Sequence, residues 1–127
     1  MNLEFPERDP LTEKIIGCAI EVHRTLGPGL LESTYESALC VELRSAGLNF
    51  ERQLIVPIVY KGQPVGDYRL DLLVEKLVIV EIKSVDRFDP IFEAQLLAYL
   101  KITGAKRGLL LNFISRLLKD SIKRLVL

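Results

Sequence analysis

The sequence lacks any long hydrophobic run. None of its apolar stretches approaches the roughly 20 residues that cross a bilayer, which argues against a membrane-spanning chain. Its first residues, MNLEFPERDPLTEK, are acidic and interrupted by prolines, which is typical of neither a signal peptide nor a transit peptide. We therefore expect no membrane association and a cytoplasmic location.

The chain also lacks net charge, because 17 basic residues balance 17 acidic ones. This argues against a protein held to nucleic acid by bulk charge alone. The charges are unevenly distributed, since residues 101–127 carry seven Lys or Arg and one Asp, whereas residues 1–50 carry eight acids and four bases. The basic end could contact phosphates, but the charge pattern alone favours the solvated side of a sheet and its loops.

Cysteine and histidine are scarce. Cys18 and Cys40 fall in helix-like stretches without metal-ligand spacing, so we expect buried free thiols rather than a disulfide. The single histidine, His23, closes a helix-like stretch. A packed side chain or a cation at the helix end explains His23 better than catalysis does.

Hydrophobic residues, in contrast, make up 49% of the 127 residues, enough for one domain with its own core. Hydrophobic periodicity predicts helices over 11–25, with Thr12 as N-cap, over 31–46, ended by Gly47, and over 91–103, ended by Gly104. Apolar runs bounded by turn residues predict three strands within 50–84 and one each over 107–113 and 121–127.

The predicted order is α-α-β-β-β-α-β-β, a mixed α/β domain with helices packed on a central sheet. We expect a single domain over residues 1–127, with residues 1–10 as an extended N-terminal segment. Turns are expected near Lys61-Gly62 and Glu75-Lys76, and Pro57 suggests that the first strand lies at an edge or carries a bulge.

The stretch DYRLDLLVEKLVIVEIKS places charged side chains inside strands that are otherwise suited to burial. Glu81 and Lys83 are two residues apart in one strand, so their side chains project from the same face. Asp71 comes from the preceding strand, and the turn decides its direction. A two-residue turn at 75–76 would put Asp71 on the other face, whereas a three-residue turn at 75–77, or a bulge, would pair it with Glu81.

Two carboxylates and a strand carbonyl form a hard-oxygen site. Asp71, Glu81 and the carbonyl of Ile82 would suit Mg²⁺ or Mn²⁺, with water completing the coordination. Lys83 could hold the attacking water or neutralise charge on a scissile phosphate. The alternative is a simple ion pair between Glu81 and Lys83 on a half-exposed strand, which this motif alone does not exclude.

The predicted helix over 91–103 carries Gln95 and Tyr99 one turn apart, hence on one face. Gln95 interrupts an apolar helix, and a buried amide would find partners at a carboxylate site. A Gln facing solvent explains this helix equally well. Asp86 and Asp89 could approach the metal from the preceding loop, although solvation or capping of the helix explains them as well.

These motifs together resemble the PD-(D/E)xK nuclease superfamily, whose pattern is matched, in order, by Asp71, Glu81-Ile82-Lys83 and Gln95-xxx-Tyr99. The stretch GPGLLESTYESAL adds Gly29, Glu32 and Tyr35 in the pattern G-x-x-E-x-x-Y, which resembles the GxxExxY proteins of that superfamily. The resemblance covers about residues 15–127.

The resemblance implies a restriction-endonuclease-like core and a nuclease that uses Mg²⁺ or Mn²⁺. Asp71, Glu81 and the Ile82 carbonyl would hold the metal, and Lys83 would be the catalytic lysine. One departure from the superfamily's name is Leu70, which stands where the name has proline; that proline is commonly absent.

The resemblance also implies roles for residues on the helices. Glu32 would match a helix glutamate that points at the metal-bound water, and Gln95 would help to fix the lysine or the substrate. Tyr99 and Tyr35 would contact the substrate strand. From position alone, Tyr35 is better explained as a core residue with its hydroxyl on a polar partner, and Gly29 as a turn residue.

The leading hypothesis is therefore a nuclease that cleaves phosphodiester bonds, with DNA favoured over RNA. A non-catalytic module that binds nucleic acid or protein is the second hypothesis, favoured by zero net charge and disfavoured by the complete ionisable set. An enzyme acting on a small phosphorylated molecule would need a closed pocket. Sequence specificity would need a partner protein or a dimer, or would be absent. The apolar stretches RGLLLNF and SIKRLVL lead us to expect a homodimer.

Overall fold

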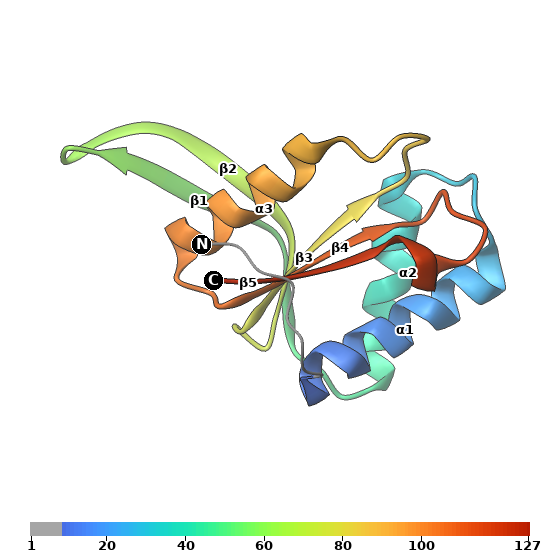
Figure 1. The fold of residues 1–127 in the computed structure, drawn as a ribbon. Helices are drawn as coiled ribbons and strands as arrows, with labels where there is room; N and C mark the ends of the chain where they lie inside the picture. The colour runs from blue at the N-terminus through green and yellow to red at the C-terminus, as the bar shows by residue number, and fades with distance from the viewer. Residues whose placement is uncertain (1–8) are drawn as a thin grey trace.

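The computed structural model describes residues 9–127 and shows a five-stranded mixed sheet with helices on both faces (Figure 1). The elements are α1 (Pro10–Leu26), α2 (Glu32–Ser45), β1 (Phe50–Tyr60), β2 (Gln63–Val74), β3 (Val78–Lys83), α3 (Pro90–Thr103), β4 (Arg107–Asn112), a 3₁₀ turn η1 (Leu118–Ser121) and β5 (Ile122–Val126). The predicted α/β class and element order are confirmed.

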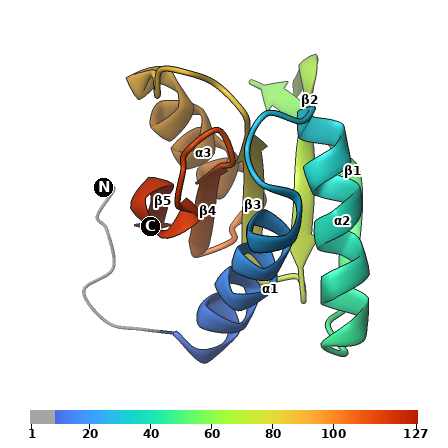
Figure 2. The same ribbon diagram turned by 90° about the vertical axis from the view of Figure 1, so that its right-hand side faces the viewer.

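The strands lie in the order β1-β2-β3-β4-β5, so the sheet follows the chain. Neighbours are antiparallel except for β3 and β4, which are parallel. A parallel pair needs a crossover, and α3 provides it. Figure 2 shows the result: α1 and α2 cover one face of the sheet and α3 covers the other. As predicted, Pro57 lies on an edge strand, one residue before a register shift between Ile58 and Val59.

Each face of the sheet has its own buried cluster. Leu72, Val80 and Leu111 belong to the larger cluster, which α1 and α2 complete. Ile79 and Leu110 belong to the smaller one, beneath α3. Alternate residues of β3 and β4 therefore face opposite cores, which explains why these strands are apolar without interruption.

The strands β1 and β2 extend beyond the sheet as a two-stranded arm (Figure 1). The pairing of β2 with β3 ends at Leu72, whereas its pairing with β1 continues to the tip of the hairpin. The arm changes layers where it leaves the sheet, because Leu72 packs in the cluster beneath α1 and α2, whereas Leu70 packs in the cluster beneath α3. This change of face occurs at Asp71.

The start of α1 differs from the prediction. The N-cap is Asp9, whose carboxylate accepts hydrogen bonds from the backbone N–H and the hydroxyl of Thr12. Thr12 is thus the third helical residue and not the cap, because an aspartate with Pro10 after it offers both a cap and a favourable first position. The predicted extended segment 1–10 lies mostly outside the described residues, and Pro10 is helical.

Other expectations about single residues hold. Asp89 caps α3 by accepting a hydrogen bond from the N–H of Ile91 at 2.9 Å. Cys18 and Cys40 are both free thiols, as expected, but only Cys40 is buried and Cys18 is half-buried. His23 is buried at the end of α1, with its Nε2 2.7 Å from the carbonyl oxygen of Ser115, which favours the packed helix-end interpretation.

The apolar stretches that suggested a homodimer are largely accounted for within the chain. β4 is buried between β3 and β5, and Leu125 of β5 packs in the cluster beneath α3. Several exposed large hydrophobic side chains lie instead on the arm: Ile55, Val59, Tyr60, Val65 and Tyr68. No helix within residues 9–127 is long and apolar enough to span a bilayer.

Candidate active site

The turn between β2 and β3 has the three-residue spacing that the site hypothesis requires. Leu72 pairs with Val80 and Val74 pairs with Val78, so the turn comprises residues 75–77. One step beyond the last of these pairs, the same register places Asp71 opposite Glu81. The geometric condition set out from the sequence is therefore met.

Asp71 and Glu81 lie at a fork, because β2 and β3 separate after Leu72 and Val80. Separation leaves backbone amides without a strand partner, and the two carboxylates take them up. The N–H of Ile82 donates to Asp71 Oδ2 at 2.8 Å, and the N–H of Asp71 donates to Glu81 Oε2 at 2.9 Å. Each carboxylate keeps one oxygen that accepts no backbone hydrogen bond.

Glu81 is almost completely buried, with 6% of its surface exposed. Burial raises its pKa to about 8, and the nearby charge of Asp71 acts in the same direction. The N–H of Asp71 and the charge of Lys83 partly offset this rise. Two carboxylates that repel each other in a buried position are stabilised by a cation between them.

The donor set at the fork fits a hard divalent cation. The Lys83 carbonyl accepts a hydrogen bond from the N–H of Phe113, on the β4 side, so the preceding carbonyl of Ile82 points the other way, into the fork. One carbonyl and two carboxylates are oxygen ligands of the kind that Mg²⁺ and Mn²⁺ prefer. Within residues 9–127, no group of three or more His, Cys, Asp or Glu side chains has metal-site geometry.

Lys83 ends β3 on the face that α3 covers. Its Nζ lies 4.7 Å from the centre of the Phe92 ring, a cation–π contact. It forms no ion pair with Glu81 among the residues described, so the ion-pair alternative is not the arrangement found. Lys83 nevertheless lies close enough to lower the pKa of Glu81.

The two predicted residues of α3 have different surroundings. Tyr99 is half-buried and makes an edge-to-face contact with Tyr68 at 5.4 Å between ring centres. Burial raises the pKa of Tyr99, and the charges of Glu81, Tyr68 and Asp71 act in the same direction. Gln95 is exposed, and no partner for its amide occurs among the described residues. The alternative of a solvent-facing Gln therefore describes it better than a buried amide.

The G-x-x-E-x-x-Y residues hold the loop between α1 and α2 against the end of β3. Glu32 is exposed and accepts a hydrogen bond from the N–H of Ser84 at 3.0 Å. Tyr35 is fully buried, and its hydroxyl donates to the Gly27 carbonyl and accepts from the N–H of Leu30. This placement favours the core interpretation of Tyr35 over a contact with substrate.

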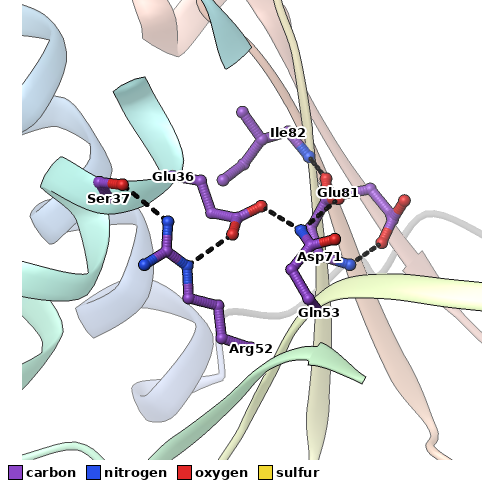
Figure 3. A network of polar contacts seen from close by, with 7 residues as sticks. All are labelled: Glu36, Ser37, Arg52, Gln53, Asp71, Glu81 and Ile82. Carbon is purple, nitrogen blue, oxygen red and sulfur yellow. Dashed lines mark hydrogen bonds and ion pairs between the residues drawn. The ribbon is translucent and has the colours of Figure 1, made fainter. Parts of the chain in front are cut away.

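A second helix glutamate, Glu36, which the sequence analysis missed, is linked to the fork through the side chain of Gln53. Glu36 is 5% exposed and accepts hydrogen bonds from Arg52 Nε at 2.6 Å and from Gln53 Nε2 at 2.7 Å (Figure 3). The same Gln53 nitrogen lies 3.5 Å from Asp71 Oδ1. A signal existed, because Glu36 lies in a stripe with Leu39 and Leu43, where helical spacing predicts apolar residues.

The basic C-terminal region is partly neutralised by acids from elsewhere in the chain. Ion pairs join Arg107 to Asp9, Lys123 to Glu93 and Arg124 to Glu13. A cavity of about 480 Å³ lies between the end of α1 and the loop after β4, and it is lined by Ile20, His23, Arg24, Gly27, Pro28 and residues 116–119. Neither fork carboxylate lines it, so it gives no support to an enzyme with a closed phosphate pocket.

Residues 9–125 match the PD-(D/E)XK nuclease superfamily. The chain belongs to this superfamily. Its members typically are phosphodiesterases that depend on divalent metals. No curated protein and no solved structure matches the chain.

Proposed function

We propose that this superfamily member is a metal-dependent nuclease that hydrolyses phosphodiester bonds. The observation that carries the proposal is the fork, where Asp71 and Glu81 each keep one carboxylate oxygen that accepts no backbone hydrogen bond and Lys83 lies two residues beyond Glu81 along β3. A structural ion pair would not need two mutually repelling carboxylates at a point where the backbone pairing opens.

In this proposal Asp71, Glu81 and the Ile82 carbonyl hold Mg²⁺ or Mn²⁺. When bound, the cation lowers the pKa of water and neutralises charge on the phosphate. Lys83 is placed to orient the attacking water or to stabilise negative charge as it develops on the phosphate. Its ammonium lies over the Phe92 ring, and this cation–π contact favours a fixed position for the side chain.

The substrate surface is proposed to include Tyr99, whose ring contacts Tyr68 of the arm and whose pKa is raised by burial and by the charges of Glu81, Tyr68 and Asp71. Gln95, one turn earlier and exposed, would meet the nucleic acid strand from the same helix. Glu32 would act on the metal-bound water from beside the end of β3, where its Oε2 accepts from the N–H of Ser84. Within the superfamily, the pattern formed by Gly29, Glu32 and Tyr35 leads us to place the chain with the GxxExxY proteins.

The test is cleavage of single- and double-stranded DNA and RNA in the presence of Mg²⁺ or Mn²⁺, with wild type compared with Lys83→Ala. Arg87→Ala is a matched control, because it removes a positive charge from the loop that follows Lys83. Activity that Lys83→Ala abolishes and Arg87→Ala keeps supports the nuclease. No cleavage of any substrate by folded, metal-loaded wild type contradicts it and favours a binding module, which electrophoretic mobility shifts on the same nucleic acids would detect.

A further inference from the structure

Gln53 has an unusual backbone conformation for its position. Four non-glycine residues within 9–127 have positive φ, and three of them, Lys61, Glu75 and Lys76, lie in hairpin turns. Gln53, with φ +51°, is the one that lies inside a strand. A positive φ in the left-handed region is sterically disfavoured for residues with a Cβ atom, whereas glycine adopts it readily. Strain of this kind in a strand is a reason to ask what the side chain does.

The position of Gln53 is that of a direct neighbour of the fork. The pairs Arg52 with Leu72 and Leu54 with Leu70 flank it, which places Gln53 opposite Asp71 across the two strands. This is also the point at which the arm changes layers. The backbone turn at Gln53 therefore determines how β1 passes the candidate metal ligand.

The side chain of Gln53 connects helix α2 to the fork. Its Nε2 donates to Glu36 Oε1 at 2.7 Å and lies 3.5 Å from Asp71 Oδ1, so one amide nitrogen sits between two carboxylates (Figure 3). Arg52 Nε holds the other oxygen of Glu36 at 2.6 Å, and Arg52 also donates to the hydroxyl of Ser37 at 2.7 Å. Glu36 is thus fixed on both oxygens, and the amide of Gln53 has a firm anchor.

We propose that Gln53 is a positioning residue that sets the metal affinity of Asp71, by holding its amide nitrogen between Asp71 and the anchored Glu36. The inference rests on the proposed function, because it concerns the same fork. The amide offsets the repulsion between the carboxylates of Asp71 and Glu36. It also restricts Asp71 to the orientation in which Oδ2 accepts from the N–H of Ile82 and Oδ1 remains available to a cation. The longer contact to Asp71 leaves that oxygen free to bind a cation.

The test compares Gln53→Gly with Lys61→Gly by calorimetric titration with Mn²⁺ alone. Both substitutions put glycine at a similar positive φ, +51° in the strand and +48° in the hairpin turn, so they relieve the same backbone strain. We expect Gln53→Gly to bind Mn²⁺ about tenfold or more weakly, as loss of a partner that orients a metal ligand usually does. Lys61→Gly should bind as wild type, and the melting temperatures of both should stay within about 5 °C of wild type.

A second comparison separates positioning from simple loss of contacts. If Gln53 acts through its anchor, Glu36→Gln and the double variant Glu36→Gln/Gln53→Gly should bind Mn²⁺ as weakly as Gln53→Gly, and not weaker by the product of the two effects. Unchanged affinity in Gln53→Gly, or an equal loss in Lys61→Gly, overturns the inference and leaves the nuclease proposal standing. Absence of Mn²⁺ binding by wild type overturns the metal site itself.

Discussion

The two halves of β3 differ in what lies beside them. Val78, Ile79 and Val80 pair with β2 on one side and with β4 on the other, and all three are completely buried. Residues 81–83 keep β4 as a partner, but β2 has turned away, and the Asp71 carboxylate occupies its place by accepting from the N–H of Ile82. Chemistry is therefore expected where a strand loses a neighbour, because carboxylates there both satisfy the backbone and remain open to a ligand.

The largest effect should come from removing charge in the open half. Asp71→Asn keeps an oxygen that can accept from Ile82 but removes the negative charge. We expect cleavage to fall by at least about 10²–10³-fold, with no loss of fold. Steady-state kinetics measure the fall, and the melting temperature should no longer rise with Mn²⁺. Retention of both activity and the Mn²⁺ response would remove Asp71 from the site.

Substitution in the paired half of β3 should instead reduce stability and leave activity nearly unchanged. Ile79→Ala removes a fully buried side chain that packs with Leu96 and Leu100 of α3. Because a cavity remains, we expect a loss of about 2–5 kcal/mol in the free energy of unfolding, with activity below the melting temperature nearly unchanged. Urea unfolding and parallel kinetics check this. A large loss of activity without a loss of stability would show that the two halves of β3 are not separate in role.

The next largest effect should be on the pH dependence of the free energy of unfolding, which we expect to depend on the open half of β3 and not on the paired half. Burial and Asp71 raise the pKa of Glu81 from 4.5 to about 8, so the folded chain holds a proton there that the unfolded chain releases. Between these values the unfolded state binds fewer protons, and the free energy of unfolding contributed by this group falls as the pH rises.

Glu81→Gln should remove that decline and be more stable than wild type near pH 8.5, by about 1 kcal/mol or more. Urea unfolding at pH 5 and pH 8.5 without divalent metal measures the difference. Ile79→Ala serves as the control, because it should lose the same amount at both pH values. If the free energies of unfolding of Glu81→Gln and wild type changed with pH in parallel, Glu81 would be ionised in the folded chain.

The smallest effect is expected at the margin of the fork. Tyr99→Phe removes a hydroxyl whose pKa is raised by burial and by the charges of Glu81, Tyr68 and Asp71, but keeps the ring that contacts Tyr68. Loss of one hydrogen bond to the substrate strand corresponds to about a 2–10-fold rise in KM, with kcat little changed. Kinetics on the preferred nucleic acid measure this, with Tyr60→Phe, at the exposed end of β1, as the control. Equal effects of both variants would exclude a specific role for Tyr99.

Much of the fold follows from local patterns that the tertiary structure did not override. Helical spacing located α1, α2 and α3 to within one or two residues, and apolar runs with turn residues located the strands. The N-cap was the exception, because Asp9 and Thr12 are both good caps and only the position of Pro10 decides between them. Such local competition cannot be resolved from hydrophobic periodicity.

The sequence by itself determined the spacing of Glu81 and Lys83 and the turn condition that pairs Asp71 with Glu81, because strands alternate strictly. Only the tertiary structure decided which helix residues reach the fork. Glu32 and Glu36 are one turn apart on α2, and the choice between them depends on where β1 passes the helix. Gln53 gave no sequence signal at all, since its role arises from a bend in β1 that places its amide between Glu36 of α2 and Asp71 of β2.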